Sequence, residues 1–182
     1  AEAGSNSLYQ RWYRSPDINT IWYNPEVRYQ PWLKPKPAAD GSGVRMADIT
    51  NAQAAPWDPV TTGLNPATFD LVTKRNITTT WCTAANNSAG SSKRSFSPGI
   101  YYRLKSGAKP DSTSSFVLYD VNNVDGPYAP DVKSADRIDC AGTKCTQAEE
   151  LRNFANWFTY YRMRESMAKA AVTESFFNFK DK

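Results

Sequence analysis

The hydrophobic pattern is clearest in the last third of the chain, where apolar residues recur at helical spacing. Leu151, Phe154 and Phe158 lie three and four residues apart, so a helix places them on one face. Thr146 and Glu149 have the spacing of a capping box, in which each side chain accepts a hydrogen bond from a backbone amide of the first turn. No Gly or Pro follows, so we predict one long amphipathic helix over residues 146–182. Its apolar positions continue at Ala168, Ala171, Val172 and Phe176.

Two runs in the middle of the chain have the residue types of β-strands. Residues 99–104 and 115–121 are rich in aromatic and aliphatic side chains, and the stretch 107–114 between them can form a hairpin connection. Residues 69–73 and 76–81 are weaker candidates, for either short strands or turns. The polar run 86–98 is typical of a surface loop.

The first 32 residues are dense in aromatic rings, which we place in extended segments at Tyr9, Trp12 and Tyr13 and over residues 21–32. Pro25 and Pro31 bound a short segment typical of extended backbone. Residues 34–66 are rich in Gly and Pro, which predicts a loop. The fold class expected is α+β, with short antiparallel strands and long loops packed on one long C-terminal helix. Residues 1–145 form the loop-rich, strand-containing region, and the helix over 146–182 forms one structural unit with it.

Composition and charge exclude several classes of function. The chain has 182 residues, 40% of them hydrophobic, with a net charge of +4 and no Lys/Arg stripe, so we expect no nucleic-acid binding. Histidine is absent, which removes Ser-His-Asp and Cys-His catalysis and most zinc chemistry. We therefore predict no enzyme activity, no catalytic residue and no cofactor. The sequence also has no run long and apolar enough for membrane insertion.

Two of the three cysteines lie close together, at Cys140 and Cys145. The loop between them contains Gly142, and a disulfide across it is sterically reasonable, which would place the protein in an oxidising compartment. The alternative is a pair of reduced thiols in a cytosolic loop. Cys82 is left over, and the sequence does not say whether it is a buried thiol or pairs elsewhere.

The N-terminal aromatic residues have two interpretations. These rings combine apolar faces with polar atoms, which suits recognition of carbohydrate or protein. The cluster consists of Trp12, Tyr13, Trp22, Tyr23, Tyr29 and Trp32, and we select Trp12, Trp22, Tyr23 and Trp32 as the recognition candidates. Rings that fill a core in place of aliphatic side chains are the other interpretation. Residues 120–126 faintly resemble a calcium-binding loop, but a valine occupies one of the required ligand positions. An Asp-Gly turn fits this stretch better, so we predict no metal site.

Two separated segments resemble the PilC/PilY type IV pilus tip adhesins. The first is Ser15-Pro-Asp-Ile-Asn-Thr-Ile-Trp-Tyr-Asn-Pro-Glu-Val-Arg-Tyr-Gln-Pro-Trp32, which is similar to a Tyr-Tyr-Asn-Pro-x-x-x-Tyr-x-Pro segment of that family. The second runs from Arg137 to Arg164 and is similar to a Cys loop followed by Asn-Phe-Ala-Asn-Trp-aromatic-x-Tyr-Tyr-Arg-x-Arg. The two segments have the same order as in the family, whereas residues 36–135 resemble nothing comparable.

The resemblance implies a von Willebrand factor A-like domain, with this chain as an insertion and the first helix of that domain. It also implies an extracellular location at the pilus tip or cell surface, and a role in attachment, pilus biogenesis and twitching motility. Its partners would be the rest of the adhesin, minor pilins, and a ligand on a host or abiotic surface. The family's Asp-x-Ser-x-Ser metal motif is missing from this chain, so metal-dependent adhesion is not carried over. The alternative from another class is a free-standing secreted carbohydrate-binding module that uses exposed Trp and Tyr faces.

Overall fold

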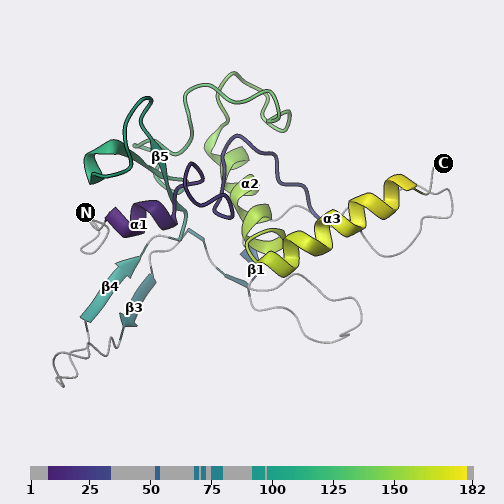
Figure 1. Ribbon diagram of the computed structural model, residues 1–182, viewed down its shortest axis with the longest axis horizontal. Helices are drawn as coiled ribbons and strands as arrows, with labels where there is room; N and C mark the ends of the chain where they lie inside the picture. Colours follow the sequence, from purple (N-terminus) through teal and green to yellow (C-terminus); the bar gives the residue numbers. More distant parts are fainter. Residues whose placement is uncertain are drawn as a thin grey trace.

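A computed structural model describes the chain over residues 8–33, 52–53, 68–69, 71–72, 75–79, 92–96 and 98–179. Its fold is α+β, as the sequence predicts, with helices and short strands along the chain (Figure 1). The elements, in chain order, are α1 (Leu8–Tyr13), β1 (Ala52–Gln53), β2 (Thr68–Phe69), β3 (Arg75–Thr79), β4 (Ser92–Phe96), β5 (Ile100–Leu104), the 3-10 helix η1 (Thr113–Ser115), β6 (Phe116–Asp120), α2 (Gln147–Tyr160) and α3 (Arg164–Phe179).

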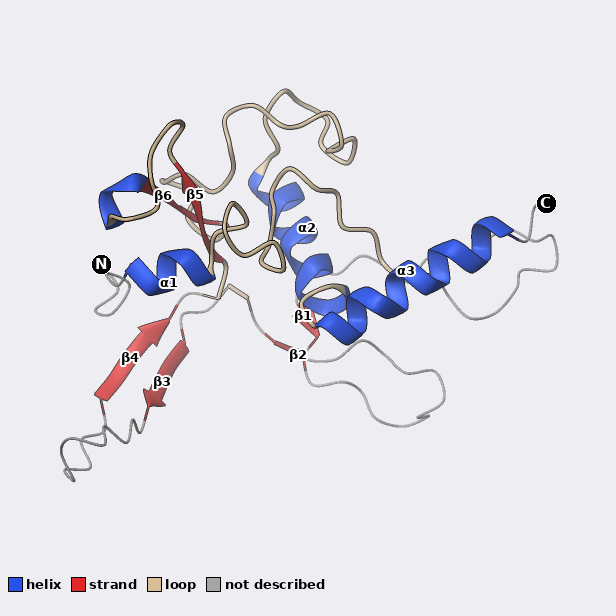
Figure 2. Ribbon diagram, in the orientation of Figure 1, coloured by secondary structure: helices blue, strands red, loops and turns tan. Residues whose placement is uncertain are grey.

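The described strands form three separate antiparallel pairs, β1 with β2, β3 with β4, and β5 with β6 (Figure 2). The β5–β6 hairpin is the one the sequence predicts, and its register pairs Tyr102 with Leu118. The connection between its strands contains Gly107, whose φ of 72° is a left-handed backbone angle that favours glycine. The local residue pattern therefore predicted both the strands and their connection.

Strand β4 corrects the prediction for residues 86–98, which was a surface loop. Residues 92–96 pair with Arg75–Thr79 in a regular antiparallel register, in which Arg94 lies opposite Ile77. Residues 92–96 lack the apolar alternation that marks a half-buried strand, so their sequence carries no signal for this pairing. In the same way, β1 lies inside the 34–66 stretch predicted as a loop, where it pairs with β2.

Helix α2 begins where the sequence places it. The Thr146 hydroxyl accepts from the Glu149 amide at 3.3 Å, and the Glu149 carboxylate accepts from the Thr146 amide at 2.7 Å. The capping box is therefore confirmed. Phe154 and Phe158, predicted to share a buried face, are 0% and 8% exposed, so that prediction is confirmed as well.

The single long helix predicted over 146–182 is wrong, because the chain forms two helices separated at residues 161–163. The Trp32 indole donates to the Tyr160 carbonyl at 3.1 Å, and the Tyr161 hydroxyl reaches the Gln30 carbonyl at 2.6 Å. These contacts hold the end of α2 against the N-terminal segment. The Arg162 amide bonds the Trp157 carbonyl, five residues back, so the helical hydrogen-bond ladder is interrupted there.

Helix α3 extends away from the body of the molecule toward the C-terminus (Figure 1). Val172 and Phe176, expected to continue the apolar face, are 53% and 72% exposed. The buried core lies instead around α2 and the N-terminal segment, and β1 packs against α2. No helix of the described residues is long and apolar enough to cross a membrane.

Candidate functional site

The N-terminal aromatic segment, residues 21–32, lies against α2, and α2 side chains bind its backbone. The Trp157 indole donates to the Ile21 carbonyl at 3.2 Å. Asn153 donates to the Val27 carbonyl at 2.9 Å and accepts from the Tyr29 amide at 2.8 Å. These bonds satisfy backbone groups that belong to neither helix nor sheet, and so they fix an irregular segment in one register along α2.

Aromatic contacts cover the same interface. Tyr23 is fully buried, and its ring centroid lies 4.8 Å from that of Phe154 and 5.3 Å from that of Tyr101. Tyr29 packs between Tyr23 and Tyr161, at centroid distances of 5.7 and 5.2 Å. Because the rings meet at tilted or edge-on angles, each contact has a geometry that aromatic pairs favour.

A buried ion pair lies beside this aromatic core. The Arg137 guanidinium is 2.7 Å from a Glu150 carboxylate oxygen, and the two side chains are 1% and 0% exposed. Tyr23 donates to the other Glu150 oxygen at 2.7 Å. Arg137 also donates to the Pro25 carbonyl at 2.7 Å and pairs with Asp139 at 3.0 Å. The network therefore joins the N-terminal segment, α2 and the loop before α2.

Burial changes the ionisation of these groups. It raises the pKa of Glu150, whereas the Arg137 charge and the Tyr23 hydrogen bond lower it. Burial, with the Glu150 charge added, raises the pKa of Tyr23 well above its usual value. Burial alone would lower the pKa of Arg137, but Tyr23, Asp139 and Glu150 together raise it. Arg137 therefore stays charged, and all three side chains are occupied in binding one another rather than poised for proton transfer.

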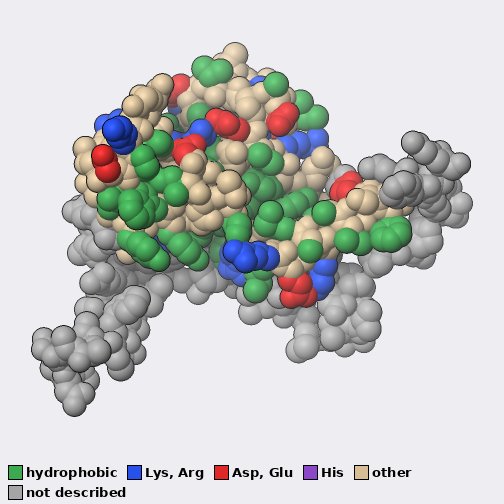
Figure 3. Space-filling model, in the orientation of Figure 1, with side chains coloured by type: hydrophobic (Ala, Val, Ile, Leu, Met, Phe, Trp, Pro, Cys, Tyr) green, Lys and Arg blue, Asp and Glu red, His purple; other side chains and the backbone are tan. Residues whose placement is uncertain are grey.

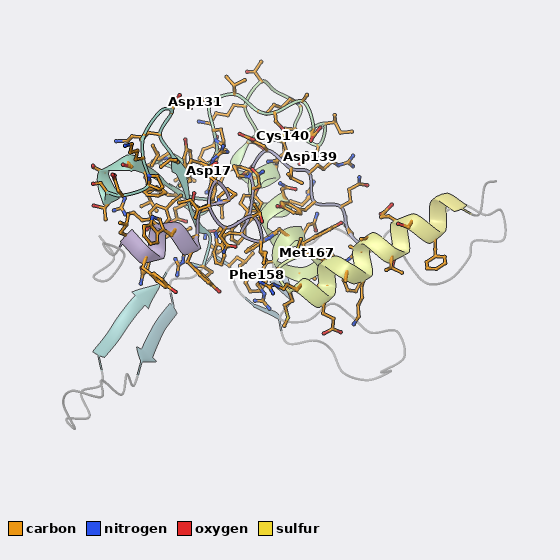
Figure 4. The ribbon with its side chains drawn as sticks, viewed as in Figure 1. Asp17, Asp131, Asp139, Cys140, Phe158 and Met167 are labelled. Atoms are coloured by element: carbon orange, nitrogen blue, oxygen red, sulfur yellow. A yellow bond between two sulfur atoms is a disulfide. The ribbon has the colours of Figure 1, made fainter. Side chains whose placement is uncertain are left out.

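The predicted disulfide is present between Cys140 and Cys145, whose Cα atoms are 5.0 Å apart. Figure 4 labels Cys140 and Asp139 near the start of α2. Cys140 Sγ lies 3.3 Å from the Arg137 guanidinium, and Lys133 donates to the Cys140 carbonyl. The bond therefore closes the loop 140–145, which lies between Arg137 and the start of α2.

Of the four aromatic residues proposed for recognition, Trp12 is the most exposed, at 38%, and its indole donates to the Pro110 carbonyl at 2.5 Å. Tyr23 has no exposed surface. Trp22 is half-buried beside Trp157, at a centroid distance of 5.1 Å. Trp32 is half-buried and packs on Tyr160. The structure thus brings Trp22 and Tyr23 into one core cluster, while Trp12 lies apart from them on α1.

Other aromatic side chains are exposed near Trp12. Tyr9 and Tyr13 are 72% and 59% exposed, and Figure 3 shows hydrophobic side chains gathered over α1. Tyr9 and Tyr13 are four residues apart and therefore lie on the same side of this short helix. From the sequence, Tyr13 belongs to the aromatic cluster considered for recognition and Tyr9 does not. The extended backbone expected for both residues is wrong, because Leu8–Tyr13 is helical.

A small polar pocket opens beside the interface of segment 21–32 with α2. Its volume of about 70 Å³ is well below the several hundred Å³ of a typical small-molecule site. Two arginines and two carboxylates, none of them among the sequence candidates, contribute to its wall. The pocket is lined by Arg28, Tyr29, Gln30, Pro31, Asp139, Glu149, Arg152, Asn153 and Asn156.

The stretch 120–126 forms turns that its own side chains stabilise. Asp120 accepts from the Asn122 amide at 3.0 Å, and Asn123 accepts from the Asp125 amide at 3.2 Å. This is the usual behaviour of Asp and Asn at turns. In the described part of the chain, no three His, Cys, Asp or Glu residues are grouped so that they could hold a metal ion. Cys82 lies outside the described residues.

A comparison of the chain with protein-family models, curated proteins and solved structures found no match. The functional conclusion therefore depends on the residues themselves and on the contacts among them.

Proposed function

We propose that this chain is a non-enzymatic extracellular segment of a type IV pilus tip adhesin of the PilC/PilY type. In this role it supports attachment to a surface, pilus biogenesis and twitching motility. Its partners are then the remainder of the adhesin and the minor pilins at the pilus tip. On this proposal, the chain is an insertion in a von Willebrand factor A-like domain, and α2 is the first helix of that domain.

One observation carries the proposal. The two segments that resemble the adhesins, 15–32 and 137–164, are far apart in sequence, yet they form one interface. Tyr23 of the first segment binds Glu150 of the second at 2.7 Å across 127 residues, and Trp157 binds Ile21 across 136 residues. Motif residues that meet in space are expected if both motifs describe one structural unit of the parent protein. A chance likeness at two places would not require them to touch.

The disulfide supports the proposed location. Structural disulfides persist in oxidising compartments outside the cytosol, and Cys140–Cys145 is one of the bonds that hold the interface loop. The Glu150 carboxylate of this interface is buried and already accepts from Arg137 and Tyr23, so it is not free to act as a general acid or base. We therefore assign the segment a structural and adhesive role.

The test is genetic and microscopic, in the organism that encodes the chain. Immunogold labelling with an antibody against this segment should mark the tips of sheared pili. Deletion of the gene should reduce piliation, twitching zones and surface attachment, and the intact gene should restore all three. The proposal would be contradicted if the deletion strain showed normal piliation, twitching and attachment, or if the antibody did not label pili.

The second candidate is carbohydrate binding, which the exposed aromatic side chains of α1 favour. Tyr9 and Tyr13 leave more than half of their surface free, as a sugar-stacking platform requires. A glycan array probed with the chain would test whether it binds carbohydrate. Binding that is lost in Tyr13→Ala but kept in Tyr119→Ala, a ring in the hairpin, would support this candidate, and absence of binding to every glycan would contradict it.

A further inference from the structure

We infer that the pocket between segment 21–32 and the first half of α2 binds the carboxylate side chain of an acidic residue in a partner protein. This inference goes beyond the proposed function and does not depend on it. It rests on which charged groups of the pocket are already occupied and which are not.

Both carboxylates of the pocket are occupied by donors from the chain itself. Asp139 is bound by the Arg137 guanidinium, with contacts of 3.0 and 3.1 Å to its two oxygens. Glu149 accepts from the Ala141 and Thr146 amides at 3.1 and 2.7 Å. These bonds lower the pKa of Glu149, because they favour its charged form. Neither carboxylate therefore needs a cation or a ligand.

The two arginines of the pocket, in contrast to its carboxylates, are not bound by other described groups of the chain. Arg28 comes from the N-terminal segment and Arg152 from α2, and both side chains are exposed. Among the described residues, neither guanidinium has an ion pair or a hydrogen bond, whereas Arg103 and Arg137 are both bound to carboxylates. A guanidinium presents several donors in a planar fork that matches the geometry of a carboxylate. The pocket thus offers unused donors on two of its walls.

Size and charge narrow the ligand to a single carboxylate. With a volume of about 70 Å³ the pocket is far smaller than a typical small-molecule site, so it suits a small charged group rather than a whole ligand molecule. Asp139 and Glu149 line the same pocket, so a phosphate dianion would meet more repulsion than a monoanion. Among the described residues of the wall, only Tyr29 is aromatic, and its ring packs on Tyr23 and Tyr161, so it offers no free face for a pyranose. An Asp or Glu side chain of a protein meets all three conditions.

The walls of the pocket are held in place before any ligand binds. Asn153 fixes the Tyr29 amide and the Val27 carbonyl, and Asn156 donates to the Tyr29 carbonyl at 3.2 Å. The segment that carries Arg28 is thereby fixed on the helix that carries Arg152. The backbone positions of the two arginines are thus fixed relative to each other, which reduces the conformational freedom that binding has to remove.

The experiment titrates the isotope-labelled full chain with N-acetylglutamate methylamide and follows amide and arginine side-chain signals by NMR. The glutamate probe should shift signals of Arg28, Gln30 and Arg152, whereas N-acetylglutamine methylamide should not. Arg28→Gln and Arg152→Gln should each weaken binding by about tenfold or more, because each removes a charged hydrogen-bond donor. Arg152→Lys keeps the charge but loses the planar fork, so it should also weaken binding. Arg164→Gln, the same change at an exposed position of α3, should leave affinity unchanged.

Each contrary outcome overturns the inference. Equal shifts with the glutamine probe would mean that the carboxylate is not recognised. Equal weakening in Arg164→Gln would mean that only net charge matters. Tighter binding of glucuronate would make the ligand a sugar acid, and tighter binding of inorganic phosphate would make it a phosphate. Melting curves of all variants confirm that each is folded, and none of these outcomes bears on pilus localisation.

Discussion

At the scale of single residues, Glu150 is the least expected side chain of the core. It has no exposed surface, yet each of its oxygens accepts a short hydrogen bond, one from Arg137 and one from Tyr23. A buried pair of this kind often gives little net stability, because removing both charges from water costs several kcal/mol per ion. We infer that it selects the register of the interface, since any other position of the N-terminal segment would leave Glu150 without the Tyr23 hydroxyl.

Arg137→Met should destabilise the protein by about 3–5 kcal/mol, because it leaves the Glu150 charge buried without its partner. Urea unfolding measures the loss. The matched control is Arg103→Met, which removes an arginine whose side chain is 22% exposed and pairs with Asp17 and Glu26. That change should cost about 1 kcal/mol or less. Equal losses in the two variants would show that the buried pair has no special role.

The same variant should respond to pH. Without Arg137, burial raises the pKa of Glu150 in the folded protein, so the folded state favours the protonated acid. The unfolded chain ionises near the ordinary value of 4.5. The stability deficit of Arg137→Met should therefore shrink as pH falls toward that value and grow as pH rises above it. Adding Glu150→Gln to this variant should remove the dependence, and a deficit that is constant with pH would contradict the assignment.

At the scale of elements, the start of α2 is stabilised locally. Thr146→Ala removes the hydroxyl that accepts from the Glu149 amide and should cost about 0.5–2 kcal/mol. Thr173→Ala is the matched control, because its hydroxyl only bonds back to the Lys169 carbonyl inside α3. Thermal melts compare the two variants. Equal or larger destabilisation by Thr173→Ala would contradict the capping role.

Glu149 should make the stability of the protein fall as pH falls, which is opposite to the effect of Glu150 in Arg137→Met. Backbone hydrogen bonds from Thr146 and Ala141 lower the pKa of Glu149 below its ordinary 4.5. Its contribution to stability is therefore fully present above that value and is lost as pH falls through the folded-state pKa. Glu149→Gln keeps an acceptor at the cap but cannot titrate, so stability measured between pH 6 and pH 3 should fall less steeply in this variant. An unchanged slope would contradict the prediction.

The elements that the sequence predicts well are those set by local interactions. The β5–β6 hairpin follows from two apolar runs and a short connection, and the start of α2 follows from Thr146 and Glu149. The end of α2 is different, because no Gly or Pro marks it. It depends on contacts with Gln30 and Trp32, more than 100 residues away, and such contacts leave no trace in a helical period.

In the candidate site, too, the features set by local sequence are predictable and those set by distant contacts are not. Spacing and composition predict the Cys140–Cys145 bond, and aromatic density marks the N-terminal segment as important. The sequence pattern does not mark Arg137, Glu150, Arg28 or Arg152, because charged residues are surface residues in most proteins. One available signal was the position of Glu150 and Asn153, which lie three residues apart among the apolar residues of α2. A polar pair on an apolar helix face indicates a buried network.

At the scale of the whole molecule, stability should depend on α2 far more than on α3. Phe154→Ala should cost about 3–5 kcal/mol, because the ring is fully buried in the main core cluster. Phe158→Ala removes a ring that is 8% exposed and lies under the Arg162 guanidinium, and it should fall in the same range. Denaturant unfolding measures both.

Phe176→Ala is the control for these two substitutions. The same ring is removed from α3, where it is 72% exposed, so the change should stay within about 0.5 kcal/mol. A large loss in Phe176→Ala would mean that α3 is covered in solution. A loss below about 1 kcal/mol in Phe154→Ala would mean that the core cluster is not formed.

The disulfide should contribute modestly to global stability. A bond between residues five positions apart restricts a short loop of the unfolded chain, which corresponds to roughly 2 kcal/mol. A Cys140→Ser, Cys145→Ser double variant should lower stability by that amount in urea unfolding. Mass spectrometry of a non-reduced digest should show the bond in protein made under oxidising conditions. Two free thiols in such protein would contradict the assignment.

The distance in sequence between the two halves of the interface has a consequence for how the protein is made. Tyr23 and Glu150 are separated by 127 residues, so the N-terminal rings leave the ribosome long before their helical partner exists. At 5–20 residues per second, that interval is roughly 6–25 s, far longer than the microseconds that a hairpin needs to form. During this time Trp22 and Tyr23 are open to water and to other nascent chains. Aggregation during synthesis should therefore depend on translation speed and on chaperones that bind exposed aromatic segments.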